Sequence, residues 1–110
     1  MRTMQALVLK HKGDPPEVCA HPVPVPGQGE ALVRVHAAAL NRRDLWIVQG
    51  QYPGIAPPVV LGSDGVGTVE LCPTDRTLEG QRVVICPSLD WGPDESVQGR
   101  DYTILGNPRD

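Results

Sequence analysis

The residues of this sequence that could do chemistry gather around a glycine-rich corner. Ser63 and Asp64 stand in residues 62–67 (GSDGVG), directly after the apolar run of residues 59–61. Glycine lets a strand bend sharply and lets another group approach the backbone closely. We therefore expect a buried strand, a tight corner that presents a hydroxyl and a carboxylate, and a second strand that resumes at residues 68–71.

Two phosphate-binding motifs share the composition of this corner but not its spacing. The dinucleotide motif G-x-G-x-x-G opens a helix, whereas the order here is G-x-x-G-x-G and β-favouring residues follow. A P-loop needs a lysine followed by serine or threonine after its last glycine, and no such pair follows Gly67. A strand corner without chemistry remains the alternative, and a second polar cluster upstream favours a site.

The second cluster opens a short helix predicted over residues 41–50. Asn41 suits the N-cap position, Asp44 completes a pattern close to a capping box, and Gly50 is placed to end the helix. Helix capping alone could explain Asn41. Asp44 could cap the helix or pair with one of the two arginines that precede it.

Short segments of β-favouring residues, separated by Gly and Pro turns, run along the rest of the chain. Besides the two at the corner, the predicted strands cover residues 5–9, 17–23, 30–40, 82–87 and 102–106. Prolines place the second of these at a sheet edge or in extended polyproline form. Residues 82–87 are expected to be buried, and residues 88–100 are polar and irregular. Because no crossover helix of about ten residues or more is available, we predict a mainly β domain, a partly open barrel with one or two short helices.

Length and charge limit the classes of protein open to this chain. Its 110 residues suffice for one domain, and a net charge of −3 without a basic stripe argues against nucleic-acid binding. No apolar run reaches the roughly 18 residues of a membrane span, and the first residues lack the apolar centre of a signal peptide. Cys19, Cys72 and Cys86 lie far apart, which indicates reduced, buried thiols in a cytoplasmic protein rather than disulfides or a metal site.

Several of these motifs occur together in one known family. They are residues 5–9 (QALVL), 30–35 (EALVRV), Asn41-x-x-Asp44, Gly50-x-Tyr52-Pro53, Pro58-x-x-Leu61-Gly62-Ser63-Asp64-Gly65-x-Gly67-x-Val69 and residues 80–83 (GQRV). In this order they resemble the N-terminal, GroES-like domain of the medium-chain dehydrogenase/reductases, which include zinc alcohol dehydrogenases and zinc-free quinone oxidoreductases. The resemblance covers residues 1–110 and implies a partly open β-barrel. It also implies a separate Rossmann domain, outside this chain, that binds NAD(P).

The resemblance further implies roles at the cleft between the two domains. The Cys, His and Glu that ligate catalytic zinc in zinc members fall here on Asn41, Ser63 and Asp64, and an amide and a hydroxyl are poor zinc ligands. The four-cysteine zinc lobe of those members corresponds to residues 88–102, which hold no cysteine. We therefore expect no zinc, and hydrogen-bond donors that stabilise a developing oxyanion instead. The expected catalytic donors are Asn41, Tyr52 and Ser63, and the expected cleft residues are Asp44, Asp64 and Arg43.

These assignments predict the substrate-side domain of a zinc-independent, NAD(P)H-dependent oxidoreductase that reduces a small quinone, enone or carbonyl compound. The alternatives are a zinc-dependent alcohol dehydrogenase-like domain and a non-enzymatic binding module like the co-chaperonin that shares the fold. Alone, the 110 residues are expected neither to bind NAD(P)H tightly nor to catalyse. Strand edges and apolar surface left uncovered predict self-association, for example as a homodimer.

Overall fold

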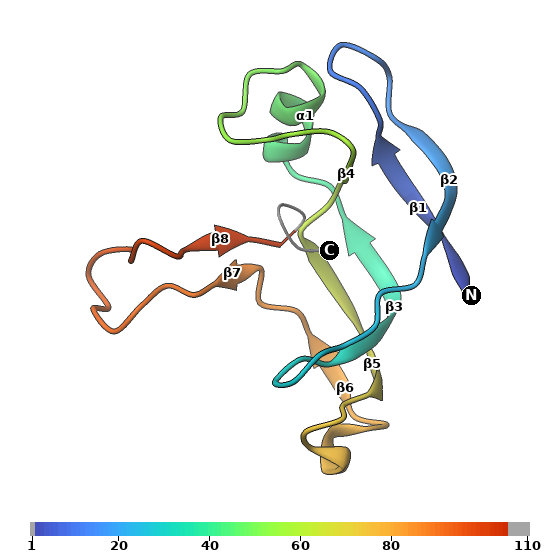
Figure 1. Ribbon diagram of the computed structural model, residues 1–110, viewed down its shortest axis with the longest axis vertical. Coiled ribbons are helices and arrows are strands. Elements are labelled where there is room, and N and C mark those ends of the chain that lie inside the picture. The colour runs from blue at the N-terminus through green and yellow to red at the C-terminus, as the bar shows by residue number, and fades with distance from the viewer. Residues whose placement is uncertain (1, 106–110) are drawn as a thin grey trace.

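The computed structural model describes residues 2–105, which form mainly strands with one α-helix among them. The elements are β1 (Thr3–Leu9), β2 (Glu17–Pro22), β3 (Leu32–Ala39), α1 (Arg42–Val48), β4 (Val59–Val60), β5 (Asp64–Leu71), the 3₁₀ turn η1 (Arg76–Leu78), β6 (Arg82–Val84), β7 (Ser88–Leu89) and β8 (Thr103–Ile104). They form open sheets in the orders β2-β1-β4, β3-β5-β6 and β7-β8 (Figure 1). The prediction of a mainly β, partly open domain with one or two short helices is confirmed.

Of the two three-stranded sheets, β2-β1-β4 is called the smaller sheet below and β3-β5-β6 the larger sheet. The smaller sheet contains the N-terminal strands and the strand that enters the corner. β1 pairs antiparallel with β2 from Thr3–Pro22 to Val8–Glu17, and with β4 through Val8–Val60 and Leu9–Val59. In this sheet β2 lies at the edge. An edge position is one of the two that the prolines in and after β2 allow, because proline has no N–H to donate to a further strand.

The larger sheet is built around β5, which pairs with β3 on one side and with β6 on the other. The β3–β5 register shifts between Val35 and Ala37, so His36 occupies a bulge, and a ring nitrogen of His36 lies 2.8 Å from the Thr68 hydroxyl. Gly67 lies against the Arg34 backbone so closely that a Cβ there would overlap the Arg34 carbonyl oxygen. One glycine of the motif thus permits the strands to approach, as the sequence predicts.

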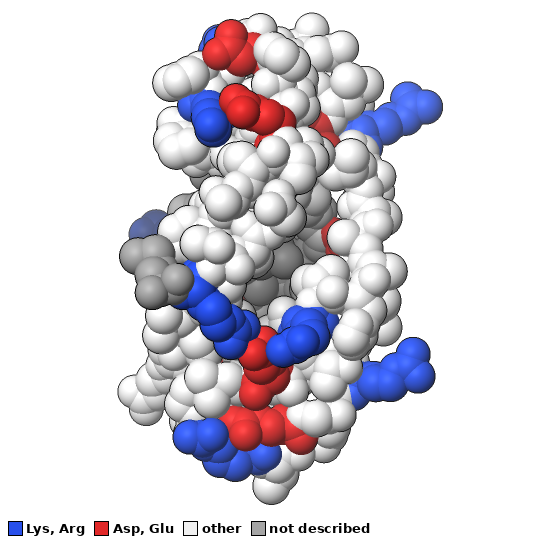
Figure 2. Space-filling view, turned by 90° about the vertical axis from the view of Figure 1, so that its right-hand side faces the viewer, with Lys and Arg blue, Asp and Glu red and all other residues white. Residues whose placement is uncertain are grey.

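The apolar core lies between α1 and the smaller sheet. Leu9, Ile47, Val59 and Leu61 form it, and Leu7, Val48, Tyr52 and Ile55 pack against it. The described part of the chain measures 43 × 39 × 21 Å, and this thinness leaves room for few enclosed side chains. Charges of both signs alternate on the face shown in Figure 2. None of the helices among the described residues is long and apolar enough to cross a membrane.

Two predictions about burial were wrong. β6 covers three residues at the edge of the larger sheet, and Val84 is 79% exposed rather than buried, because β6 pairs with β5 alone. The three thiols are free, but the Cys86 thiol is exposed and only the Cys72 thiol is fully buried. An apolar run shows that a strand forms without showing what covers it.

The segment expected to be polar and irregular folds into an extended hairpin arm. β7 and β8 pair through Ser88–Ile104 and Leu89–Thr103, and the arm projects away from both three-stranded sheets (Figure 1). The predicted last strand is confirmed at Thr103–Ile104, while its expected end, Gly106, lies outside the described residues.

Candidate functional site

A buried carboxylate ties the start of α1 to the glycine corner. Asp44 is 3% exposed, and its two oxygens accept backbone hydrogen bonds of 2.8 Å each, one from the N–H of Asn41 and one from the N–H of Gly62. Two N–H donors satisfy the charge of a buried carboxylate. Of the two roles open to Asp44, the structure shows helix capping, and it adds a partner that the sequence did not reveal.

The corner itself turns the chain from the smaller sheet to the larger one. The N–H of Leu61 donates to the carbonyl of Leu7 at 2.9 Å, Gly62 adopts a φ of 94°, and β5 begins two residues later. Only glycine takes such a φ without strain. The predicted strand, tight corner and second strand are therefore confirmed.

The corner brings three of the predicted site residues together. The Asn41 side chain donates from Nδ2 to Asp64 Oδ2 at 2.6 Å, across the gap between the start of α1 and the start of β5. Asn41 and Asp64 are exposed, whereas Ser63 is only 7% exposed. The sequence led us to expect Ser63 at the surface of the corner, but its side chain turns inward when the chain passes between the sheets.

The remaining predicted residues form a second pair. The Cζ of Arg43 lies 4.9 Å from the centre of the Tyr52 ring, a cation–π contact. Among the described residues, no hydrogen bond joins Tyr52 to Asn41 or Ser63. The structure thus divides the predicted donors into two groups that share the start of α1.

Arg43 and Tyr52 line a hollow of about 400 Å³ between the loop after α1 and the hairpin arm. Its other lining residues are Pro53, Gly54, Ile55, Gln98, Tyr102, Thr103 and Ile104. No local motif indicated the contribution of residues 98–104, because they lie more than forty positions downstream and reach the site only through the fold of the arm.

The donors at the corner fit a catalytic zinc poorly. Zinc prefers thiolate, imidazole and carboxylate ligands, and the corner offers a carboxamide, a hydroxyl and one carboxylate. The carboxamide directs an N–H at that carboxylate. Among residues 2–105, no three His, Cys, Asp or Glu side chains gather where they could hold a metal ion.

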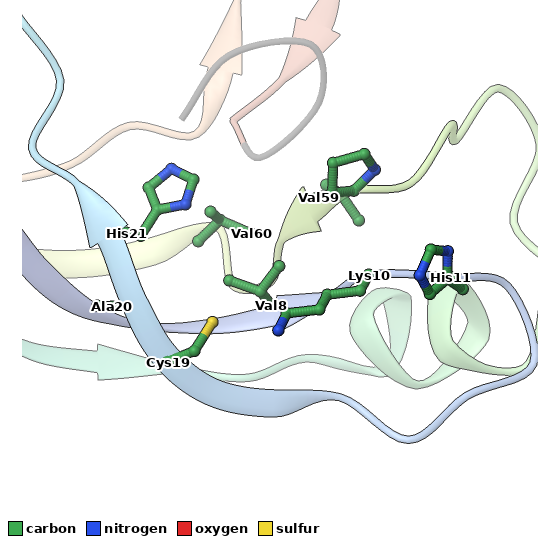
Figure 3. Close-up of a pocket in the computed structure, with 9 residues that line it drawn as sticks. Val8, Lys10, His11, Cys19, Ala20, His21, Val59 and Val60 are labelled. Carbon is green, nitrogen blue, oxygen red and sulfur yellow. The ribbon is translucent and has the colours of Figure 1, made fainter.

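A second hollow, of about 440 Å³, lies over β1, β2 and β4 and contains none of the predicted site residues. Figure 3 shows the Lys10 side chain extended toward Cys19, with His21 and His11 at opposite ends of the hollow. The Lys10 ammonium lies 3.5 Å from the Glu17 carboxylate, so its charge is already balanced. The rest of the lining is apolar and consists of Val8, Ala20, Pro58, Val59 and Val60.

The fold consists of two open sheets joined at a polar corner, with a short helix beside the corner. A comparison with known protein families assigns this fold to a class. The family model of the alcohol dehydrogenase GroES-like domain matches residues 27–106. The chain therefore belongs to the alcohol dehydrogenase GroES-like domain family, the N-terminal domain of the medium-chain dehydrogenase/reductases.

Curated relatives and a solved structure agree with this assignment. A zinc-type alcohol dehydrogenase-like protein of Schizosaccharomyces pombe is 56% identical over 88 residues, covering 74% of this chain and 25% of the relative. One from Leptosphaeria maculans is 42% identical over 76 residues, covering 64% and 21%. An acryloyl-coenzyme A reductase of Sulfurisphaera tokodaii is 51% identical over 49 residues, covering 44% and 15%. A crystal structure of an NAD-dependent alcohol dehydrogenase superimposes with a TM-score of 0.81 and 39% identity, covering 96% of this chain and 34% of that one.

Proposed function

We propose that this chain is the substrate-side part of an NAD(P)H-dependent oxidoreductase that works without a catalytic zinc. The substrate would be a small quinone, enone or carbonyl compound. One observation carries the proposal: a 2.6 Å hydrogen bond from Asn41 Nδ2 to Asp64 Oδ2 joins two of the three positions to which the family resemblance assigns the zinc ligands. The name of the acryloyl-coenzyme A reductase supports an activated alkene within this substrate class.

The chain's own residues would stabilise the charge that forms on the substrate oxygen. A nicotinamide supplies a hydride in such reactions, and the substrate oxygen becomes an oxyanion. Asp64 accepts one N–H of the Asn41 amide and so orients the other. The Tyr52 hydroxyl is a further donor, and the Ser63 hydroxyl, at a residue only 7% exposed, would join them where the bound substrate reaches into the corner. Asp44 keeps the backbone of Asn41 and Gly62 in place, so the donors need little reorganisation.

The cofactor would bind mainly to a Rossmann domain that these residues do not supply. The sequence contains no G-x-G-x-x-G followed by a helix, and it covers 34% of the matched NAD-dependent alcohol dehydrogenase. We therefore expect the 110 residues alone to show neither tight NAD(P)H binding nor turnover. A fluorescence titration that found micromolar NADH or NADPH binding to them would contradict this.

Metal analysis combined with kinetics tests the absence of a catalytic zinc. In the protein that the intact gene encodes, we expect substoichiometric zinc and quinone, enone or aldehyde reduction that survives a chelator. Asn41→Ala should lower kcat roughly 100-fold, as loss of one oxyanion donor does, and the control Gln49→Ala should not. One zinc per chain, with activity lost to the chelator, would instead support the zinc-dependent alternative.

We also propose an assembly and a location, on the basis of the exposed apolar surface and the thiols. Val84 is 79% exposed and Leu40 is 61% exposed on or beside the larger sheet, which supports a homodimer. The three free thiols support a cytoplasmic location. Native mass spectrometry is expected to give a dimer. A monomer at high concentration would contradict this, and a many-membered ring would support the co-chaperonin-like alternative.

A further inference from the structure

Arg43 has hydrogen-bonding capacity that the described part of the chain does not use. Among residues 2–105, its Nε–H is buried without a hydrogen-bond partner, and its guanidinium forms no ion pair. The contact with Tyr52 is made to the face of the ring and consumes none of the five N–H donors. A buried N–H without an acceptor costs free energy. The side chain is therefore suited to take an acceptor from outside the protein.

The nearest carboxylate on the same helix cannot serve as that acceptor. Asp44 uses both of its oxygens for backbone N–H groups, one from Asn41 and one from Gly62. The positive charge of Arg43 is thus not neutralised within α1, although Asp44 is its neighbour in the sequence.

The hollow beside Arg43 has the composition of an anion site. Among the described residues that line it, none is Asp or Glu, and Arg43 supplies the only formal charge. Tyr52, Gln98, Tyr102 and Thr103 add side-chain donors, while Ile55 and Ile104 offer apolar contact. The Tyr102 hydroxyl is already oriented by the Ser88 hydroxyl at 3.2 Å. A volume of about 400 Å³ accommodates a small molecule with one charged end.

We propose that this hollow binds an oxyanion, a carboxylate or a phosphate group, on the substrate, with Arg43 as its anchor. The stack on Tyr52 holds the guanidinium while its Nη donors, joined by Nε–H after a small rotation, engage two oxygens of the anion. This inference rests on the proposed function in one respect: Arg43 and Asn41 both stand at the start of α1, and an anchored substrate would have to extend from the hollow to the corner for its reducible group to reach Asn41. The substrate class narrows accordingly to acidic quinones, enones or carbonyl compounds.

Titrations without cofactor or turnover test the site independently of the reaction. The full chain, labelled with ¹⁵N, is titrated with sodium acetate and separately with sodium phosphate, at constant ionic strength set with sodium chloride. The Arg43 side-chain resonances report binding. We expect saturable shifts in at least one of the two titrations, and the titration that shows them identifies the anion.

Matched variants separate a site from general attraction to positive charge. Arg43→Gln should weaken binding roughly tenfold or more, as loss of charge-assisted hydrogen bonds does. Arg42→Gln removes an exposed arginine from the same helix and should change binding by less than roughly twofold. Thr103→Glu introduces a carboxylate into the lining and should abolish binding while it shifts the Arg43 resonances without any added anion. This last variant keeps Arg43 intact, so the inference can be tested even if Arg43→Gln does not fold.

Absence of saturable shifts with both anions would overturn the inference, as would equal losses in Arg43→Gln and Arg42→Gln. Failure of the proposed reductase function gives a different result. In that case the anion would still bind in an Arg43-dependent way, while Asn41→Ala would leave no activity difference to measure. An active reductase with unchanged KM for acidic substrates in Arg43→Gln would reject the anion site alone.

Discussion

At the scale of single residues, Asp44 fixes the backbone around which the candidate donors are arranged. It is 3% exposed and receives one hydrogen bond from the helix start and one from the corner, 18 positions further along the chain. Its role is therefore positional. The exposed side chains of Asn41 and Asp64 stand on backbone that Asp44 holds, because Asp44 takes two N–H groups, those of Asn41 and Gly62, that would otherwise lack acceptors.

Asp44→Ala is expected to lower the free energy of unfolding by about 3 kcal/mol, since it removes two charge-assisted hydrogen bonds and leaves two unpaired N–H groups. Asp64→Ala, at an exposed position with one side-chain partner, should cost less than about 1 kcal/mol. Urea denaturation with an unchanged m-value measures both. Equal costs for the two variants would show that Asp44 has no special positional role.

At the scale of elements, β5 organises the larger sheet and begins at the candidate site. It pairs with β3 along most of its length and with β6 near its middle. The glycines along it are not equivalent. Gly67 lies against the Arg34 backbone and has no room for a Cβ, whereas the nearest atom to a Cβ at Gly65 is the tip of the Ile85 side chain, at 3.4 Å.

Gly67→Ala is therefore expected to force β3 and β5 apart and to cost roughly 3 kcal/mol, the upper end of overpacking effects. Gly65→Ala, on the same strand and facing a flexible side chain, is the matched control and should cost under about 1 kcal/mol. Thermal unfolding and the amide resonances of Val33 and Arg34 measure the effect. A Gly67→Ala protein as stable as Gly65→Ala would disprove the close approach of the two strands.

At the scale of the whole molecule, a surface ion cluster connects the two three-stranded sheets. Arg2, next to the first residue of β1, lies 2.8 Å from Glu70 of β5, and Arg34 of β3 lies 3.4 Å from the same carboxylate. The hydrogen bond from Arg2 is the main cause that lowers the pKa of Glu70, and the charge of Arg34 adds to it. The same contact raises the pKa of Arg2.

The pKa of Glu70 is lower in the folded state than its ordinary value of 4.5, so ionised Glu70 stabilises the fold when the pH is above 4.5. This contribution disappears as the pH falls through the lowered pKa of the folded state. Glu70→Gln should therefore lower Tm at pH 7, and the difference from the unmodified protein should vanish in acid. Molar salt should also reduce it, because both arginines are exposed. Melting curves from pH 7 to pH 2.5 measure it, and a constant difference at all pH values would contradict the pKa shift.

Much of the fold could be predicted because its signals act over a few residues. Asn41 caps α1, Gly50 follows the helix with a φ of 73°, and Gly62 turns the corner with a φ of 94°. Strand positions were also predictable, since β-favouring runs bounded by Gly and Pro mark them. The proximity of Asn41 and Asp64, which are 23 positions apart, was expected from the family resemblance and not from either local motif.

The sequence by itself thus determined the elements, their turns and the two polar clusters of this protein. Tertiary structure alone decided that Ser63 turns inward, that Val84 is left exposed, and that Arg43 stacks on Tyr52 beside the hairpin arm. Burial and neighbourhood depend on segments far away in the chain, whose approach is set by the packing of whole sheets. A local sequence pattern specifies the conformation of its own residues, but it does not specify which residues from other parts of the chain pack against them.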